Sequence, residues 1–134
     1  MNNPVSNKTF IFNAAIDPQS INNLYGDDYD YIEEVFDTVL QEYETLANHI
    51  AAAFAASDLS NLKSSVHKIK PIFGFVGILE VQHECQQFEN LCQSAASVLA
   101  VSSDYQNLYK HIIISKEIIE EEKRKLAVFN NNRS

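Results

Sequence analysis

The sequence feature that most constrains the fold is one long stripe of apolar residues in the first half of the chain. Its members recur at alternating spacings of four and three residues, which places them along one face of an α-helix. A stripe of this length predicts a long amphipathic helix that must bury the apolar face against other elements. The members are Ile32, Phe36, Val39, Tyr43, Leu46, Ile50 and Ala53.

Other patterns predict further helices around this one. A short helix should begin at Asp17-Pro18, because aspartate is a favoured N-cap and proline a favoured first helical residue, and should stop at Gly26. Asp27 and Asp28 offer the next N-cap, and Asp58 can cap the helix after that. We expect a connection over residues 98–103 and a last helix over about 105–128. The later apolar stripes are Leu62, Val66, Ile69 and Phe73, then Val81, Cys85, Phe88, Cys92 and Ala95, then Leu108, Ile112, Ile119 and Leu126.

These patterns predict an all-α protein, an antiparallel four-helix bundle with an additional short N-terminal helix. The chain has only three Gly and three Pro, too few turn-forming residues for a many-stranded β protein. Its 134 residues fit one domain. We assign residues 1–15 to an N-terminal extension that packs locally or frays, 16–129 to the bundle domain, and 130–134 to a flexible tail.

The charge balance argues against several classes of partner. The net charge is −8, and no basic run exceeds Lys123-Arg124-Lys125, so we expect no nucleic-acid binding. No apolar run reaches the ~18 residues that span a bilayer. Met1 and the polar start favour a free-standing protein without a secretion signal. On one helix Cys85 and Cys92 would lie ~10 Å apart, too far for a disulfide, and two free thiols favour a cytoplasmic protein.

A second stripe on the helix around residue 67 carries candidate chemistry. Lys63, His67, Lys70 and Gly74 recur at helical spacing, roughly 110° from the apolar face, which predicts an exposed His67 with a lysine one turn away on either side. Neutral imidazole is a nucleophile near pH 7. Neighbouring ammonium groups favour the neutral ring and would stabilise phosphoryl oxygens. A histidine between lysines on the flank of a helix is more often a solvated residue without a chemical role, and composition alone leaves that alternative open.

Two residues near His67 depart from ordinary helix chemistry. Pro71 removes the hydrogen bond to the carbonyl of His67, at a usual cost of ~3 kcal/mol. This predicts either a kink that marks a functional site or a bend that wraps the helix around the bundle. Gly74 leaves room for the close approach of a partner surface.

Other constellations support weaker hypotheses. His83, Cys85 and Cys92 could suggest a metal site. Both cysteines, however, fall on the apolar stripe, where a free cysteine commonly acts as a small hydrophobe. Glu80 and His83 form only half of a di-iron bundle motif. The chain has no glycine-rich phosphate loop. We therefore expect no metal, no cofactor and no ATP-dependent kinase activity.

The segment His67-Lys-Ile-Lys-Pro-Ile-Phe-Gly-Phe-Val-Gly77 resembles the signature of histidine-containing phosphotransfer (HPt) domains, with a lysine three residues and a glycine ten residues after the histidine. The resemblance extends over about residues 16 to 96. It implies that His67 accepts a phosphoryl group from an aspartyl phosphate of a receiver domain and passes it to another receiver. It also implies that Lys70 steadies this group and that Gly77 permits close packing. Many family members have glycine where Pro71 stands.

The resemblance implies a phosphocarrier of a multistep two-component phosphorelay. Its partners would be response-regulator receiver domains and a hybrid histidine kinase, with Mg²⁺ held by the receiver, and we expect a monomer. From helical geometry, Lys63, Ser64 and Gly74 would complete the docking face, while Pro71 and Gly77 would be structural. Two alternatives are an HPt-like bundle that only docks a partner and a module that serves oligomerisation.

Overall fold

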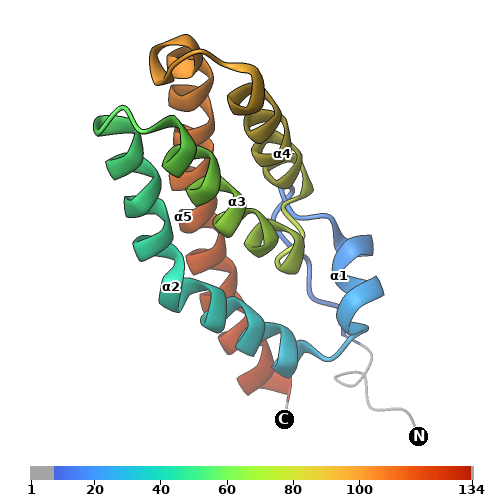
Figure 1. Cartoon of the computed structure of the whole chain (residues 1–134). Helices are drawn as coiled ribbons and strands as arrows, with labels where there is room; N and C mark the ends of the chain where they lie inside the picture. The colour runs from blue at the N-terminus through green and yellow to red at the C-terminus, as the bar shows by residue number, and fades with distance from the viewer. Residues whose placement is uncertain (1–7, 134) are drawn as a thin grey trace, which may run out of the picture.

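The protein is an all-α bundle in which consecutive long helices run antiparallel (Figure 1). The computed structural model describes residues 8–133, and these contain no strand. The elements are α1 (Pro18–Tyr25), α2 (Tyr29–Ala55), α3 (Leu59–Phe75), α4 (Leu79–Ser94), the short 3₁₀ helix η2 (Val98–Val101) and α5 (Ser102–Arg133). The predicted four-helix bundle with a short N-terminal helix is confirmed.

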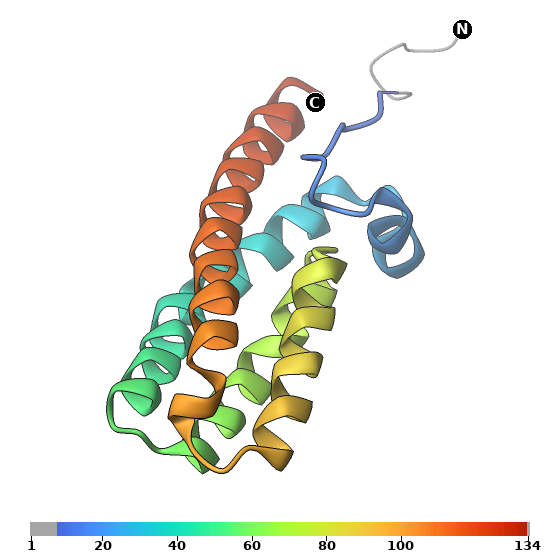
Figure 2. The same ribbon diagram turned by 90° about the horizontal axis from the view of Figure 1, so that it is seen from above.

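The helices surround one core, with α2 packed against α3 and α5, and α3 packed against α4. Figure 2 shows α2 and α5 as the long pair and α1 to one side of the bundle. Three predicted N-caps are present, since the carboxylates of Asp17, Asp28 and Asp58 accept hydrogen bonds from backbone N–H groups of the first turns of α1, α2 and α3. Aspartate at these positions satisfies donors that a helix leaves free.

The apolar stripes form the core almost as predicted. In α2 two positions differ from the predicted stripe: Tyr29 at the start of the helix is also buried, and Ala47 is buried where Leu46 is only half-buried. Alternating spacings of four and three only approximate 3.6 residues per turn, so either neighbour fits the pattern. In α4 the stripe also brings one acidic side chain, Glu89, into a buried position.

The predicted flexible tail over residues 130–134 is wrong for 130–133, which continue α5. The Asn130 amide donates to the carbonyl oxygen of Tyr29 at 3.0 Å and to Glu33 at 2.8 Å. The Arg133 guanidinium pairs with Asp30 at 3.2 Å. These contacts bind the last turn of α5 to the start of α2, which the polar composition of this segment did not indicate. Ser134 lies outside the described residues.

The segment before α1 packs against the bundle over its described part. Phe10 is buried, and its ring makes edge contacts with Phe12 and Phe129. The backbone N–H of Asn13 donates to Glu122 at 2.7 Å, and this fully buried carboxylate also pairs with Lys125. Of the predicted N-terminal extension, residues 1–7 lie outside the described part of the chain. No helix over residues 8–133 is both long and apolar enough to cross a membrane.

Gly77 fixes the turn between α3 and α4 beside the start of α1. Its φ is +74°, a left-handed conformation that favours glycine. A Cβ atom at this position would lie 3.1 Å from side-chain atoms of Ile16 and Ile21. Its carbonyl oxygen accepts from the N–H of Asp17 at 2.8 Å. The close approach therefore holds α1 against the α3–α4 turn.

Candidate functional site

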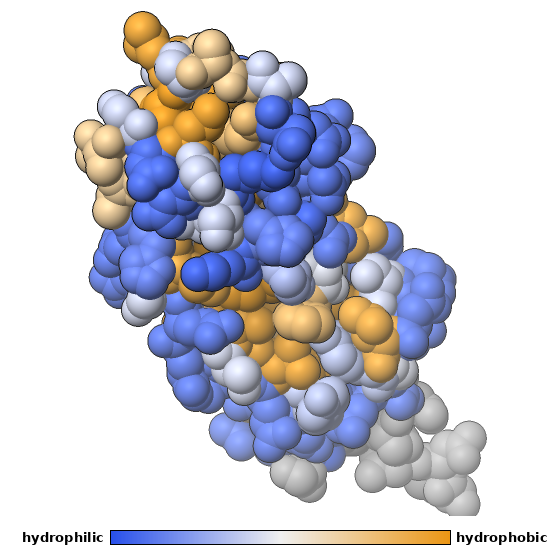
Figure 3. Space-filling model, in the orientation of Figure 1, coloured by the Kyte–Doolittle hydropathy of each residue, from blue (hydrophilic) through white to orange (hydrophobic). Residues whose placement is uncertain are grey.

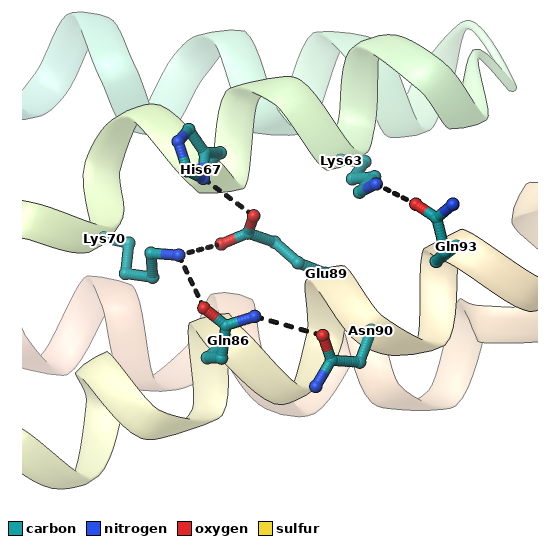
Figure 4. Close-up of polar contacts among 7 residues, drawn as sticks. All are labelled: Lys63, His67, Lys70, Gln86, Glu89, Asn90 and Gln93. Carbon is teal, nitrogen blue, oxygen red and sulfur yellow. Dashed lines mark hydrogen bonds and ion pairs between the residues drawn. The ribbon is translucent and has the colours of Figure 1, made fainter.

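The predicted stripe on α3 faces a complementary polar stripe on α4 (Figure 4). The four α3 positions meet α4 side chains in reverse order, because the two helices run antiparallel. The pairs are Lys63 with Gln93, His67 with Glu89, Lys70 with Glu89 and Gln86, and Gly74 with Gln82. The seam between α3 and α4 is thus polar along its outer edge, while the apolar residues of both helices lie beneath it.

His67 is held at one ring nitrogen and open at the other. Its side chain is 66% exposed, and Nδ1 lies 2.8 Å from a carboxylate oxygen of Glu89. A carboxylate only accepts hydrogen bonds, so in the neutral ring Nδ1 carries the proton and donates it to Glu89. Nε2 then keeps its lone pair. The other ring nitrogen points away from α4 (Figure 4), and this geometry presents a nucleophilic nitrogen to solvent.

The Lys70 ammonium lies deeper in the seam than the ring. Nζ is 2.8 Å from the second carboxylate oxygen of Glu89 and 2.7 Å from Oε1 of Gln86, and the side chain is only 18% exposed. Glu89, whose side chain is 8% exposed, therefore joins His67 and Lys70 through its two oxygens. A nearly buried carboxylate with two charge-assisted contacts is held in one orientation, and it fixes both partners.

The sequence did not reveal Glu89 as part of the site. The apolar members of α4 predict its buried face, but a polar stripe lies beside them and consists of Gln82, Gln86, Glu89 and Gln93. Its spacings of four, three and four residues are helical, so this signal was available. The structure changes the expected electrostatics, because the charged group in contact with the ring is a carboxylate rather than an ammonium.

The other predicted site residues occupy several environments. Ser64 is exposed on the outer face of α3, and Lys63 is half-buried beside α4. Gly74 faces α4, where a Cβ atom would lie 2.6 Å from Nε2 of Gln82, so its small size serves contact between the two helices. Pro71 is exposed within α3, which is continuous through it.

The outer face of α3 leads from His67 to an apolar groove. His67, Pro71 and Phe75 are exposed and follow one another at intervals of four residues, which places them along one side of the helix. Phe75 lines a groove of about 420 Å³ between α1, α2 and α3, together with Leu24 and Tyr31. Figure 3 shows apolar surface exposed where these three helices meet.

The two cysteines, which lie near His83 in the sequence, are buried in the core and do not belong to the seam between α3 and α4. Cys85 is fully buried and Cys92 nearly so. Burial raises the pKa of the Cys85 thiol to about 12, which keeps it protonated, as expected for a small hydrophobe. Over residues 8–133, no three His, Cys, Asp or Glu side chains gather in a way that could hold a metal ion.

Comparison with known proteins decides the family. The sequence model of the Hpt domain matches residues 34–114, more than half of the chain, and this range contains both the histidine and its partners on α4. The chain belongs to the Hpt domain family. Hpt domains are phosphocarriers rather than kinases, so this domain has a histidine phosphotransfer role in two-component signalling.

The fold of this Hpt domain is similar to a crystal structure of the HPT domain from an Hpt sensor hybrid histidine kinase of Shewanella. The TM-score is 0.72 at 14% sequence identity, and the match covers 83% of this chain and 95% of that chain. At this identity the likeness concerns the fold. No curated protein sequence matches the chain.

Proposed function

We propose that His67 is the phosphoryl acceptor of a multistep phosphorelay and exchanges the group with aspartates of receiver domains. The observation that carries this proposal is the state of the ring, with Nδ1 bound to Glu89 at 2.8 Å and Nε2 in solvent. Nε2 attacks the phosphorus of an aspartyl phosphate in line. The P–O bond to the aspartate breaks, the N–P bond forms, and the aspartate leaves as a carboxylate.

Glu89 supports this step without touching the phosphorus. The ring becomes more positive as the N–P bond forms, and the proton stays on Nδ1. The adjacent carboxylate favours that positive charge. Lys70 steadies the phosphoryl oxygens once the group has arrived. Mg²⁺ belongs to the receiver in this scheme, and the domain performs no ATP-dependent phosphorylation of its own.

The receiver docks over the outer face of α3. The exposed line from His67 through Pro71 to Phe75 gives it a continuous path from the reacting nitrogen to the apolar groove. Ser64 extends this face toward the start of α3, and Lys63 lies beside it at the edge of the seam with α4. Contacts of this kind fix orientation and bring two reacting atoms together, which supplies much of the rate in phosphoryl transfer.

The proposal is tested by incubating the chain with phosphorylated receiver domains and measuring its mass. We expect an acid-labile gain of one phosphoryl group that His67→Gln abolishes. His83→Gln is the matched control, because His83 is exposed on α4 and should not affect the gain. A gain that survives in His67→Gln would contradict the assignment, and receiver binding without any gain would favour the docking-only alternative.

A further inference from the structure

Lys70 does not face the place where the phosphoryl group would sit. Its ammonium contacts two acceptors on α4, Glu89 at 2.8 Å and Gln86 at 2.7 Å. The ring nitrogen free for phosphorylation points away from α4 (Figure 4). The ammonium must therefore turn away from at least one of these acceptors before it can bind phosphoryl oxygens on Nε2.

The side-chain amide of Gln86 is itself held in one orientation. Its Nε2 donates to Oδ1 of Asn90 at 3.0 Å, one turn further along α4, which leaves Oε1 as the atom that faces Lys70. An amide can turn either its oxygen or its nitrogen toward a neighbour. The contact with Asn90 therefore selects the orientation that attracts a cation.

We propose that Gln86, oriented by Asn90, is a latch that holds Lys70 against α4 while His67 is unphosphorylated and releases it when the phosphoryl group arrives. This inference rests on the proposed function of His67. Gln86 is a positioning residue, since it acts only through Lys70. Glu89 contacts both Lys70 and Nδ1 of His67, whereas Gln86 contacts Lys70 and not the ring, so Gln86 can be replaced without disturbing His67.

The latch affects the balance between the two states of the domain. A contact that is strongest in the unphosphorylated state stabilises that state, and in the phosphorylated state it still competes with the phosphoryl oxygens for Lys70. Gln86 is neutral, so the dianionic phosphoryl group competes with it for Lys70 on favourable terms. Removing Gln86 should leave Lys70 more available to the phosphoryl oxygens and should slow loss of the group from His67.

The test uses phosphoramidate, a small phosphodonor that needs no receiver and releases ammonia as the phosphoryl group passes to histidine. We expect the lifetime of phosphorylated His67 to be about threefold longer in Gln86→Ala, because the hydrogen bond removed is exposed to solvent and lies at the low end of the usual contribution. Asn90→Ala should lengthen it by less. Gln87→Ala is the matched control, since Gln87 is exposed but lies beside the cleft between α4 and α5, and it should change nothing.

A second variant pair shows whether the effect passes through Lys70. Lys70→Ala should shorten the lifetime, and adding Gln86→Ala to it should have no further effect. If Gln86→Ala lengthened the lifetime of phosphorylated His67 equally with and without Lys70, the latch would be overturned. An unchanged or shorter lifetime in the single variant would overturn it as well.

A measurement without phosphorylation separates the latch from the proposed function. The rate at which an N-hydroxysuccinimide acetate reagent acetylates Lys70 should rise about threefold in Gln86→Ala, with the exposed Lys68 as internal reference. An unchanged rate would contradict the latch even if His67 is phosphorylated. A raised rate in a chain whose His67 accepts no phosphate would support the contact and contradict the acceptor role.

Discussion

At the scale of single residues, the site depends on which nitrogen of His67 keeps its lone pair. Glu89 decides this by accepting a hydrogen bond from Nδ1 at 2.8 Å, so that Nδ1 keeps the proton. The carboxylate is nearly buried yet paired with Lys70, so it can be charged without an isolated charge in the interior. A surface histidine without such a partner would divide its population between two tautomers.

Replacing Glu89 should therefore slow phosphoryl acceptance. We expect Glu89→Leu to lower the transfer rate to His67 about tenfold, the low end for loss of a residue that orients a reacting group. Glu89→Gln should lower the transfer rate by less, because its amide oxygen can still accept a hydrogen bond from Nδ1. The ¹⁵N chemical shifts of the ring nitrogens report the tautomer directly. Equal rates in both variants, with unchanged ring shifts, would remove Glu89 from the mechanism.

The cysteines give a test of burial in the same helix. Only thiolate reacts with iodoacetamide, and burial raises the pKa of Cys85 from 9.0 to about 12. At pH 8 Cys85 should stay unmodified in the folded protein and react readily in urea, with native reactivity rising only as the pH approaches 12. Cys92, whose pKa is also raised, is the comparison within the chain. Rapid native labelling of Cys85 at pH 8 would show that α4 does not pack as described.

At the scale of elements, most helices follow from the sequence because their signals are local. The aspartate caps and the apolar stripes depend on neighbours one or two turns away, so α1, α2 and α3 begin where predicted. The end of α5 was missed because Asn130 and Arg133 are held by residues about 100 positions earlier in the chain. The polar stripe that contains Glu89 is visible in the sequence, but its contact with His67 and Lys70 depends on how α3 and α4 pack against each other.

The turn between α3 and α4 can be tested by comparing two glycines that both have a positive φ. Gly77→Ala should destabilise the protein by about 2 kcal/mol or more, because a left-handed φ costs ~1–2 kcal/mol and the added methyl group meets Ile16 and Ile21. Gly26 has φ +63° but open space around it, so Gly26→Ala should cost only the ~1–2 kcal/mol of the backbone strain. Urea denaturation measures both. Equal losses would mean that the contact with α1 does not constrain this turn.

At the scale of the whole molecule, the two ends of the described chain are packed together. Phe10 joins Tyr29 at the start of α2 and Phe129 near the end of α5 in one aromatic cluster. These contacts pack the N-terminal segment against the start of α2 and the end of α5. This end of the bundle is opposite the α2–α3 and α4–α5 connections (Figure 1). This packing was not predicted from sequence, where the Phe10 segment offered no helical or strand periodicity.

The cluster predicts a stability effect from a segment outside the helices. Phe10→Ala should destabilise the protein by about 2–4 kcal/mol, since a mostly buried aromatic ring is lost. The neighbouring Ile11 is 78% exposed, and Ile11→Ala should stay within about 0.5 kcal/mol of the unchanged protein. Thermal and urea unfolding report both values. Similar small losses in the two variants would show that the segment is not part of the core.

The proposed function depends on phosphorylation at one atom, and ³¹P–¹⁵N NMR of the ¹⁵N-histidine-labelled chain after phosphoryl transfer measures this most directly. We expect a single N–P coupling, to Nε2 of His67, with the proton retained on Nδ1. Coupling to Nδ1, or to a nitrogen of His49, His83 or His111, would contradict it.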